Sequence, residues 1–278
     1  MLSESSTDNN SILCRKCDNV PCEFVPSIHD VDSDILDGSV FAALFNESKV
    51  NELVSTESTE ISQYYFAPKL NQRQIDELYR TASDVHRMAT KYGIQIWMDG
   101  GTLLGAVRHG GLIPWDDDVD FCIWKSDRRK FRDLVLTRLS ECGYECIEWW
   151  YGGWRIFNAK ADRFLPDSET VQCGFPFVDI FPVVVKQFNA VCYWNNRAQC
   201  IWPSGLTTAN LTPLKSYVFG PFSFNGPNLP HDHLTSLYGP NYMTVCNRKY
   251  CHRTKQLLLK SKELISFDPL LPSSLRRV

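Results

Sequence analysis

The side chains best suited to chemistry are four aspartates within five residues: Asp116, Asp117, Asp118 and Asp120. The apolar residues around the last two predict a strand over residues 118–124, on which Asp118 and Asp120 point to the same face. Two carboxylates on one face repel each other unless a cation lies between them or one of them keeps its proton. Clustered carboxylates are typical ligands of hard divalent cations, so the pattern predicts a site for Mg²⁺ or Mn²⁺.

A glycine-rich segment precedes the aspartates and reads Asp-Gly-Gly-Thr-Leu-Leu-Gly-Ala-Val-Arg-His. The pattern predicts a buried strand at Ile94–Met98, a turn formed by Gly100, Gly101 and Thr102, and a helix over Leu103–Arg108. Glycines let a backbone approach phosphate closely, and helix N-termini attract anions. Combined with the carboxylates, the segment predicts a metal-dependent site for a phosphorylated donor.

Two alternatives compete for the aspartate cluster. The spacing of Asp116, Asp118, Asp120 and Asp127 matches a calcium-binding loop, but such a loop needs glycine at its sixth position. This chain has Phe121 there, which excludes the calcium loop. The other alternative is an acidic surface turn that binds nothing, and the adjoining glycine-rich segment argues against it. Within the predicted metal site, Asp116 would reach the ion, its waters or the helix N-terminus opposite.

A fifth acid, Asp179, lies inside the apolar run Phe177–Val185, where an unpaired charge is costly. Two explanations are open. Asp179 forms an ion pair with Arg155, Arg163 or Lys160, or it is a third carboxylate brought beside the others on a neighbouring strand. The aspartate cluster favours the second explanation. Arg155 and Lys160 flank another apolar strand, and we expect them to contact donor phosphates unless they are solvated or paired.

The composition excludes several classes of protein. The 278 residues are 44 % hydrophobic and 22 % charged, as in a globular protein with room for one sizeable domain. Residues 1–68 hold twelve acidic and three basic residues, which leaves twenty acidic and twenty-six basic residues in the remainder. This basic body suits an anionic donor, but its charges are scattered, so we expect no nucleic-acid partner. The sequence offers no candidate membrane span and no signal peptide, and the oligomeric state stays open.

Cysteine and histidine spacing offers weaker metal signals. Cys14, Cys17 and Cys22 could form a zinc knuckle, a disulfide or idle thiols, and no partner pair follows at zinc-finger spacing. His231 and His233 resemble a metal-binding pair, although ordinary histidines at a helix start explain them as well. Disulfides and buried thiols are equally consistent with two further pairs, Cys142–Cys146 and Cys246–Cys251.

Composition and periodicity divide the chain into three segments. Residues 1–68 are acidic and rich in Ser and Thr, so we expect them to be mostly disordered, with a short helix near Val40–Phe45. We expect residues 69–252 to form the folded unit that carries the site. Residues 253–278 are expected to form a helix at 253–265 and a tail.

The folded unit alternates helical and strand patterns, which is typical of an α+β fold with a mixed sheet and flanking helices. Helical spacing over 75–92 ends at Gly93, and Ser126 is the expected N-cap of a second helix that closes near Gly143. The Pro- and Gly-rich stretch Leu206–Pro230 suggests a lid over the donor. Further expected elements are strands at Tyr144–Trp150, Trp154–Lys160 and Phe177–Val185, and a helix at Leu229–Tyr238.

Three blocks of the sequence, in this order, resemble the LicD family, which includes bacterial phosphocholine transferases, fukutin and fukutin-related protein. They are Gly100-Gly-Thr-Leu-Leu-Gly-Ala-Val-Arg-His, Ile113-Pro-Trp-Asp-Asp-Asp-Val-Asp and Val178-Asp-Ile-Phe-Pro. Leu237-Tyr-Gly-Pro-Asn-Tyr-Met is similar to the closing motif of that family. The resemblance covers about residues 70–252.

The resemblance implies a nucleotidyltransferase-like fold. It also implies transfer of a phospho-alcohol, such as phosphocholine or ribitol phosphate, from a CDP-linked donor to a glycan hydroxyl. A strict nucleotidyltransferase that uses an NTP is one competing hypothesis. A catalytically silent relative that binds nucleotide or glycan is another. Animal members usually carry a membrane anchor and act in the secretory lumen, so the expected location is the Golgi by resemblance, or the cytoplasm if this protein truly lacks an anchor.

Motif positions in the resemblance also imply roles for individual residues. Asp118 and Asp120 would be the metal-binding pair, and Asp179 would be the third acid. The glycine turn would face the phosphates. Asp179 is the expected acceptor of the hydroxyl proton, with Asp116 and Asp117 as alternatives because a fully metal-ligated acid is a poor base.

Overall fold

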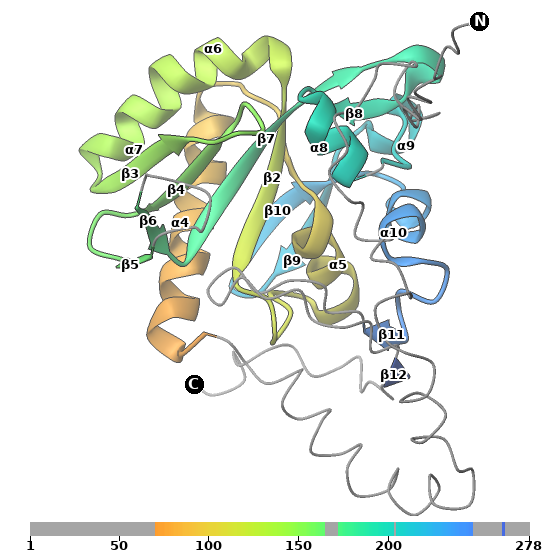
Figure 1. Cartoon of the computed structure of the whole chain (residues 1–278), viewed down its shortest axis with the longest axis horizontal. Coiled ribbons are helices and arrows are strands. Elements are labelled where there is room, and N and C mark those ends of the chain that lie inside the picture. Colours follow the sequence, from red (N-terminus) through yellow and green to blue (C-terminus); the bar gives the residue numbers. More distant parts are fainter. Residues whose placement is uncertain (1–69, 165–171, 203, 247–262, 265–278) are drawn as a thin grey trace, which may run out of the picture.

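The computed structural model describes residues 70–164, 172–202, 204–246 and 263–264 (Figure 1). A mixed sheet with strand order β1-β2-β7-β4-β3 forms its centre, and β8 pairs with β7 as well. Helices flank this sheet, so the predicted α+β class is confirmed. The zinc hypothesis at Cys14–Cys22 and the helix near Val40–Phe45 lie outside the described residues. The strands of the sheet are β1 (Ile96–Met98), β2 (Asp118–Trp124), β3 (Tyr144–Glu148), β4 (Trp154–Asn158), β7 (Phe177–Val185) and β8 (Val191–Tyr193).

Strands β2 and β7 run parallel to each other at the centre of the sheet. The other pairings of the sheet are antiparallel. Side chains alternate along β2 as the sequence predicted. Val119, Phe121 and Ile123 are completely buried on one face, and Asp118 and Asp120 belong to the opposite face. One face of the sheet is therefore the apolar core, and the other carries the carboxylates.

Helix α4 (Gln72–Lys91) covers the apolar face, and Figure 1 shows it in orange behind the sheet. Its start is fixed by a capping box, in which Asn71 and Gln74 each accept a hydrogen bond from the backbone of the other. It ends just before Gly93, whose φ of +64° suits a residue without a side chain. Its buried face matches the predicted helical spacing: Ile75, Leu78, Tyr79, Ala82, Val85, Met88 and Ala89.

The helix that follows β2 starts differently from the prediction. Ser126 lies inside a 3-10 turn and is not an N-cap, so that prediction is wrong. Beyond it, a π-helical segment interrupts the helical run, which a pattern of 3.6-residue spacing does not reveal. Gly143 follows the end of the run with a φ of +88°, close to where the sequence predicted it. The segments are η2 (Lys125–Asp127), α6 (Arg128–Lys130), η3 (Phe131–Leu136) and α7 (Thr137–Glu141).

Part of the stretch Leu206–Pro230 packs into the core, and its expected role as a lid over the donor stays a prediction. It contains a short helix, α9 (Thr208–Leu211), and a hairpin of β9 (Lys215–Phe219) and β10 (Phe222–Gly226). Phe219 and Phe224 of the hairpin are buried, and their rings contact those of Tyr79 and Phe121. The hairpin therefore extends the core beside α4 and β1.

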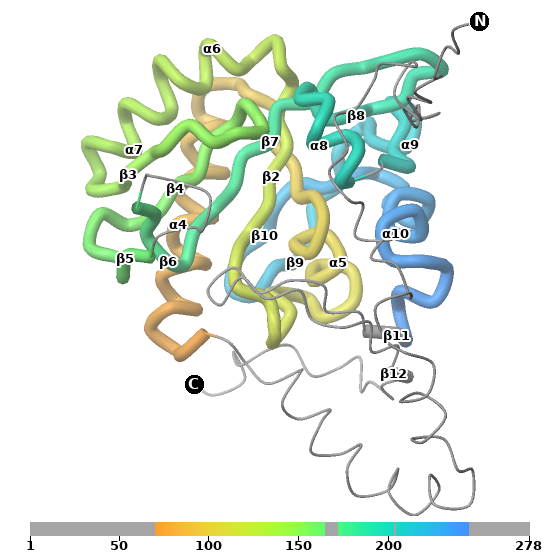
Figure 2. Tube along the Cα trace, in the orientation of Figure 1, coloured from red at the N-terminus to blue at the C-terminus, as the bar shows by residue number. Residues whose placement is uncertain are grey.

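Figure 2 traces the chain through the remaining elements. Of the helix expected at 253–265, the structure describes only β12 (Glu263–Leu264), which pairs with β11 (Val245–Cys246), so helix is wrong for these two residues. No described helix combines the length and apolar character needed to cross a bilayer. The other elements are α5 (Gly100–His109), β5 (Asp162–Phe164), β6 (Cys173–Phe175), η4 (Gln187–Asn189), α8 (Asn196–Ile201) and α10 (His231–Tyr238).

Candidate active site

The parallel pairing of β2 and β7 brings the predicted carboxylates together. Asp120 and Asp179 are direct partners in the register of the two strands. Asp118, Asp120 and Asp179 each offer a carboxylate oxygen that lies within 4.8 Å of the other two. Asp118 and Asp179 are buried, and Asp120 is partly buried. The three acids singled out from the sequence therefore share one small site, although they come from segments about sixty residues apart.

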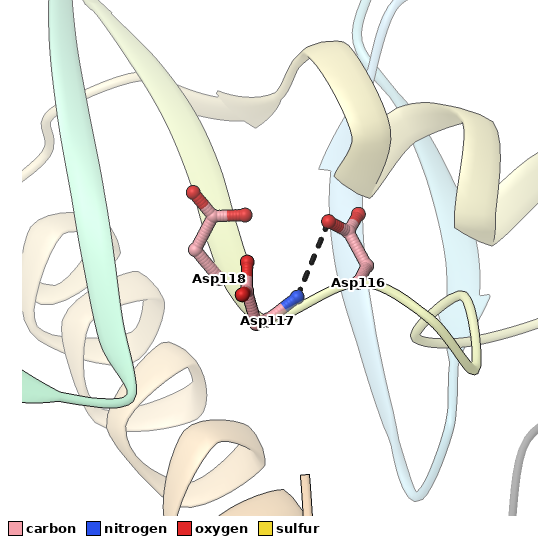
Figure 3. Close-up of side chains that lie close together, drawn as sticks. All are labelled: Asp116, Asp117 and Asp118. Atoms are coloured by element: carbon pink, nitrogen blue, oxygen red, sulfur yellow. Dashed lines mark hydrogen bonds between the residues drawn. The ribbon is translucent and has the colours of Figure 1, made fainter. Parts of the chain in front are cut away.

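A second group of carboxylates shares Asp118 (Figure 3). Asp116, Asp117 and Asp118 also offer oxygens within 4.8 Å of one another. Hydrogen bonds hold the turn that presents them: Asp116 N–H donates to Ile113 O at 2.9 Å, and Asp117 N–H donates to Asp116 Oδ1 at 3.2 Å. Asp117 is fully buried, whereas Asp116 is partly exposed. Asp118 therefore connects the turn that carries Asp116 and Asp117 to the site between β2 and β7.

The electrostatics of the site favour a bound cation. Burial raises the pKa of Asp120 well above its ordinary value, and the negative charges of Asp118 and Asp179 raise it further. Like charges held together in this way favour a protonated carboxyl or a cation between them. Oxygen ligands alone are what Mg²⁺ and Mn²⁺ prefer. The residues present fit such an ion, with Asp118, Asp120 and Asp179 as the residues that would hold it.

Asp179 also forms a buried ion pair with Arg155. Nε and Nη2 of Arg155 donate to the two carboxylate oxygens at 2.9 and 2.8 Å. The guanidinium lies 4.3 Å from the ring centroid of Trp149 and 3.7 Å from that of Phe177. The two explanations offered for Asp179 therefore hold together: it is ion-paired, and it belongs to the carboxylate cluster. Because the paired donors of Arg155 are used on Asp179, Arg155 orients this acid, and its contact with a donor phosphate stays a prediction.

Lys160 is not brought to the carboxylates. It lies in the exposed turn after β4, where its backbone N–H donates to Asn158 Oδ1 at 2.9 Å. Of the two cations expected to contact phosphate, Arg155 is the one whose side chain touches an acid of the cluster. The spacing along the chain placed both near the strand, but β4 ends at Asn158 and the chain turns away there.

The glycine-rich segment is the first turn of α5 and not a separate turn before it, because α5 begins at Gly100. Gly100 has a φ of +52°, a conformation that residues with side chains rarely adopt. A Cβ on Gly101 would lie 2.6 Å from Asp116 Oδ2, so glycine leaves room for that carboxylate. Thr102 Oγ1 accepts a hydrogen bond from Asp120 N–H at 2.7 Å. The segment therefore places two acids beside a helix N-terminus, where negative charge is favourable.

A buried cluster around Asp99 was not predicted from the sequence. The Asp99 carboxylate accepts hydrogen bonds from Tyr193 OH and from Cys122 Sγ, the latter at 3.3 Å, and Oδ1 lies 2.5 Å from His233 Nε2. Burial alone would raise the pKa of Asp99, but His233 and these hydrogen bonds lower it to about 2. The only signal in the sequence was the position of Asp99 at the head of the glycine-rich segment.

Tyr238, in α10, was also missed. Its hydroxyl lies near the start of α5, because a Cβ on Gly100 would be 3.8 Å from Tyr238 Oη and 3.1 Å from Asp120 Oδ2. Burial, and then the charges of Asp116 and Asp120, raise the pKa of Tyr238 well above its ordinary value, so the phenol keeps its proton. The motif Leu237-Tyr-Gly-Pro-Asn-Tyr-Met was the signal that could have pointed to it.

The weaker metal signals do not form sites in the described part of the chain. His231 Nδ1 lies 3.2 Å from Tyr242 OH, whereas His233 contacts Asp99, so the two histidines have different partners. Neither belongs to a metal-capable group of the described residues. Cys142 and Cys146 are free thiols, which excludes a disulfide between them. The side chains of Cys246 and Cys251 lie outside the described residues.

Residues 93–229 match the family model described as "LicD/FKTN/FKRP, nucleotidyltransferase domain". The matched segment contains the glycine-rich segment, the aspartate cluster and Asp179. Fold and site thus belong to a nucleotidyltransferase domain. This match to the LicD family, over 137 residues or just under half of the chain, confirms the motif resemblance.

Three relatives show how far the likeness extends. An uncharacterized protein of Rickettsia prowazekii is 30 % identical over 188 residues, which cover 67 % of this chain and 62 % of that protein. Lipopolysaccharide cholinephosphotransferase LicD of Haemophilus influenzae is 43 % identical over 56 residues, 20 % of this chain and 21 % of that protein. Ribitol 5-phosphate transferase FKRP of Homo sapiens is 48 % identical over 50 residues, 18 % of this chain and 10 % of that protein. The match thus spans less than two thirds of each relative.

Proposed function

We propose that this protein is a metal-dependent phosphotransferase. It moves a phospho-alcohol, such as phosphocholine or ribitol phosphate, from a CDP-linked donor to a hydroxyl of a glycan. The observation that carries the proposal is the cluster of Asp118, Asp120 and Asp179 beside the N-terminus of α5. Two relatives with matching segments, a cholinephosphotransferase and a ribitol 5-phosphate transferase, support a phospho-alcohol as the transferred group.

The donor's diphosphate is the part of the substrate that this site suits best. A Mg²⁺ or Mn²⁺ ion held by the three acids supplies charge neutralisation to the diphosphate and to the leaving CMP. The chain's own residues fix the positions of the acids. Arg155 holds Asp179 through two hydrogen bonds, and Thr102 holds the backbone of Asp120. The backbone of Gly100 lies at the α5 N-terminus, where N–H groups bind phosphate oxygens readily.

The proposed reaction is a substitution at phosphorus. The oxygen of the acceptor hydroxyl bonds to the phosphorus that carries the alcohol, and the bond from that phosphorus to the bridging oxygen of the diphosphate breaks. CMP leaves with the electron pair. The hydroxyl proton passes to a carboxylate and then to water. Because both oxygens of Asp179 already accept hydrogen bonds from Arg155, we assign the proton to Asp116 instead.

CMP release from a panel of CDP-alcohols tests this proposal. The panel contains CDP-choline, CDP-ribitol, CDP-glycerol and CDP-ethanolamine, each with Mn²⁺ or Mg²⁺ and with a mixed glycan acceptor. We expect metal-dependent release from one donor, and none from Asp120→Asn. The matched control is Asp133→Asn, which removes an exposed carboxylate that contacts Arg132 and leaves the site untouched. No release from any donor would overturn the proposal.

The same assay separates the two competing hypotheses. A strict nucleotidyltransferase would release pyrophosphate from an NTP and label the acceptor with NMP. In that reaction the acceptor attacks the phosphorus next to the nucleoside. A silent relative would bind CDP in the presence of Mn²⁺ without turnover. The clustered carboxylates argue only against a silent relative that binds no metal, since like charges kept together with no ion to balance them are destabilising.

A further inference from the structure

Helix α10 lies beyond the residues that match the family and nevertheless reaches the site. The match ends at residue 229, whereas α10 spans His231–Tyr238. It packs against α5, beside which it lies in Figure 1. Two of its side chains reach the start of α5: His233 contacts Asp99, and the Tyr238 hydroxyl lies near Gly100.

His233 anchors α10 to the residue that precedes α5. Its Nε2 lies 2.5 Å from Asp99 Oδ1, and both side chains are at most 5 % exposed. The same carboxylate accepts hydrogen bonds from Tyr193 and Cys122, so its position is fixed from three sides. Asp99 N–H in turn donates to Asp120 O at 3.1 Å. This chain of hydrogen bonds connects α10 to the carboxylate-bearing strand β2.

A second contact holds the segment after α10. Arg108, near the end of α5, donates from Nη1 to Tyr242 O at 2.6 Å. Between the two contacts, Leu234 is completely buried. Tyr238 lies one helical turn after Leu234 and therefore on the same face of α10. The helix is thus fixed on both sides of Tyr238, and the phenol is directed toward the site.

We infer that Tyr238 is a binding residue, whose hydroxyl donates a hydrogen bond to a phosphoryl oxygen of the nucleotide-linked donor. Tyr238 Oη and Asp120 Oδ2 lie within 4 Å of one point above Gly100, at 3.8 and 3.1 Å. A phosphate bound at the carboxylates therefore has an O–H donor beside it. Asp99 and His233 are positioning residues for this contact. The inference rests on the proposed function, because it takes the ligand to be a diphosphate.

Binding of CDP in the presence of Mn²⁺ tests the role of Tyr238. The variant Tyr238→Phe removes only the hydroxyl, and we expect the Kd for CDP to rise about 10- to 100-fold, the loss typical of a hydrogen bond to a charged group. Binding of Mn²⁺ alone stays at the wild-type level. The matched control Tyr144→Phe removes a hydroxyl that donates to Asp84 Oδ2 at 2.7 Å and leaves CDP affinity unchanged. An unchanged Kd in Tyr238→Phe overturns the inference and leaves the proposed function standing.

A double-mutant cycle tests the positioning role of His233. We expect His233→Ala to lower Tm and to weaken CDP binding, and His233→Gln to recover most of the affinity, because its amide N–H can donate to Asp99. If His233 acts through Tyr238, adding His233→Ala to Tyr238→Phe weakens CDP binding less than the two separate effects combined. If the role of His233 is purely structural, His233→Ala lowers Tm but the two effects on the Kd for CDP are additive. Additive effects would overturn the positioning role of His233.

Failure of the proposed function is distinguishable from failure of this inference. If the wild type neither releases CMP nor binds CDP, inorganic pyrophosphate with Mn²⁺ replaces CDP in the same comparison, because it carries phosphoryl oxygens without a nucleoside. Weaker pyrophosphate binding by Tyr238→Phe then supports the inference alone. Equal binding by both proteins, or no pyrophosphate binding to the Mn²⁺-loaded wild type, overturns it.

Discussion

Two kinds of carboxylate lie in this sheet and at its edge with α5, and they differ in the side chains that contact them. Asp99 and Asp179 each contact a basic side chain of the protein, His233 and Arg155 respectively. The charges that act on Asp120 are those of other acids. Accordingly, the pKa of Asp99 falls to about 2 despite burial, whereas burial and these acids raise the pKa of Asp120 well above its ordinary value.

The difference separates an acid whose charge the protein itself balances from an acid whose charge it does not balance. Arg155, Asp179 and Asp120 are neighbours in register across β4, β7 and β2. Within this row of three residues, Asp179 contacts the cation Arg155, whereas Asp120 contacts no basic side chain among the described contacts. A buried charge without a partner is costly, so Asp120 either keeps its proton or has a cation bound beside it, and the proposed function takes the second of these. Asp179 belongs to both groups, which couples the structural ion pair to the proposed metal site.

Removing the charge of Asp120 is expected to have the largest effect. In Asp120→Asn, we expect CMP release to fall about 1,000-fold, because the ion that stabilises the leaving group loses a ligand. The metal-free variant should unfold at a higher temperature than wild type, since one like charge is gone. Initial rates and calorimetry in a chelator measure the two effects. Near-normal turnover at saturating Mn²⁺ would remove Asp120 from the metal-binding set.

Breaking the ion pair of Asp179 is expected to destabilise the fold strongly. Arg155→Met leaves a buried carboxylate without its partner and should lower the free energy of unfolding by about 3–5 kcal/mol. Urea unfolding measures this change. The control Arg163→Met breaks the more exposed pair with Glu145 and should cost less than about 1 kcal/mol. Equal costs for the two variants would contradict the structural role of the buried pair.

Metal binding should stabilise the wild type by an intermediate amount. Mn²⁺ at 100 times its Kd should raise the free energy of unfolding by about 2.7 kcal/mol, because the ion binds only the folded protein. We expect most of this gain to disappear in Asp120→Asn. Thermal unfolding with and without Mn²⁺ measures it. The same shift in both proteins would place the ion elsewhere, with the group of Asp116, Asp117 and Asp118 as the next site to test.

Acid should destabilise the protein in two separate steps, and each titrating group should contribute about 1–3 kcal/mol. Two histidines contribute to the upper step: burial lowers the pKa of His86 to about 4, and burial, and then the charge of Arg108, lower the pKa of His109 to about 4. Between pH 6.5 and 4 such a histidine is therefore protonated in the unfolded chain but neutral in the folded protein, and the free energy of unfolding falls. The pKa of Asp99 is about 2, below its ordinary 3.8, so its contribution is lost between pH 3.8 and 2.

Urea unfolding from pH 7 to 2 measures both steps. The variant His109→Gln should reduce the decline between pH 6.5 and 4 to the part that His86 contributes, and it should leave the lower step in place. An unchanged slope in that variant would show that His109 does not carry the upper step. This comparison separates a buried neutral base from a buried paired acid.

Much of the fold could be predicted because the relevant patterns are local. Alternation along β2 and helical spacing along α4 depend on near neighbours in the chain, and both elements formed where expected. The hairpin β9–β10 was missed because its buried aromatics, such as Phe219 and Phe224, are too few to make a periodic signal. The π-helical segment η3 was missed because one widened turn barely changes the spacing of apolar residues.

The acids of the candidate site could be predicted from the sequence, but the residues that hold them in position could not. Residue types and spacing were enough to single out Asp118, Asp120 and Asp179, because buried acids on apolar strands are unusual. They left three possible partners for Asp179, and only the register of β4 against β7 selected Arg155. Lys160 looked equivalent in the sequence, but it lies past the end of β4 in an exposed turn.

The sequence by itself determined which side chains are available for chemistry: a cluster of aspartates, a glycine-rich segment before it and an acid inside an apolar run. Those features depend on residue types at short spacings, which no later packing can change. Tertiary structure alone decided which acids receive an internal cation, and it brought His233 to Asp99 and Tyr238 to the start of α5. These contacts join residues more than 130 positions apart, and their geometry is set by how the helices pack on the sheet, for which local patterns carry no signal.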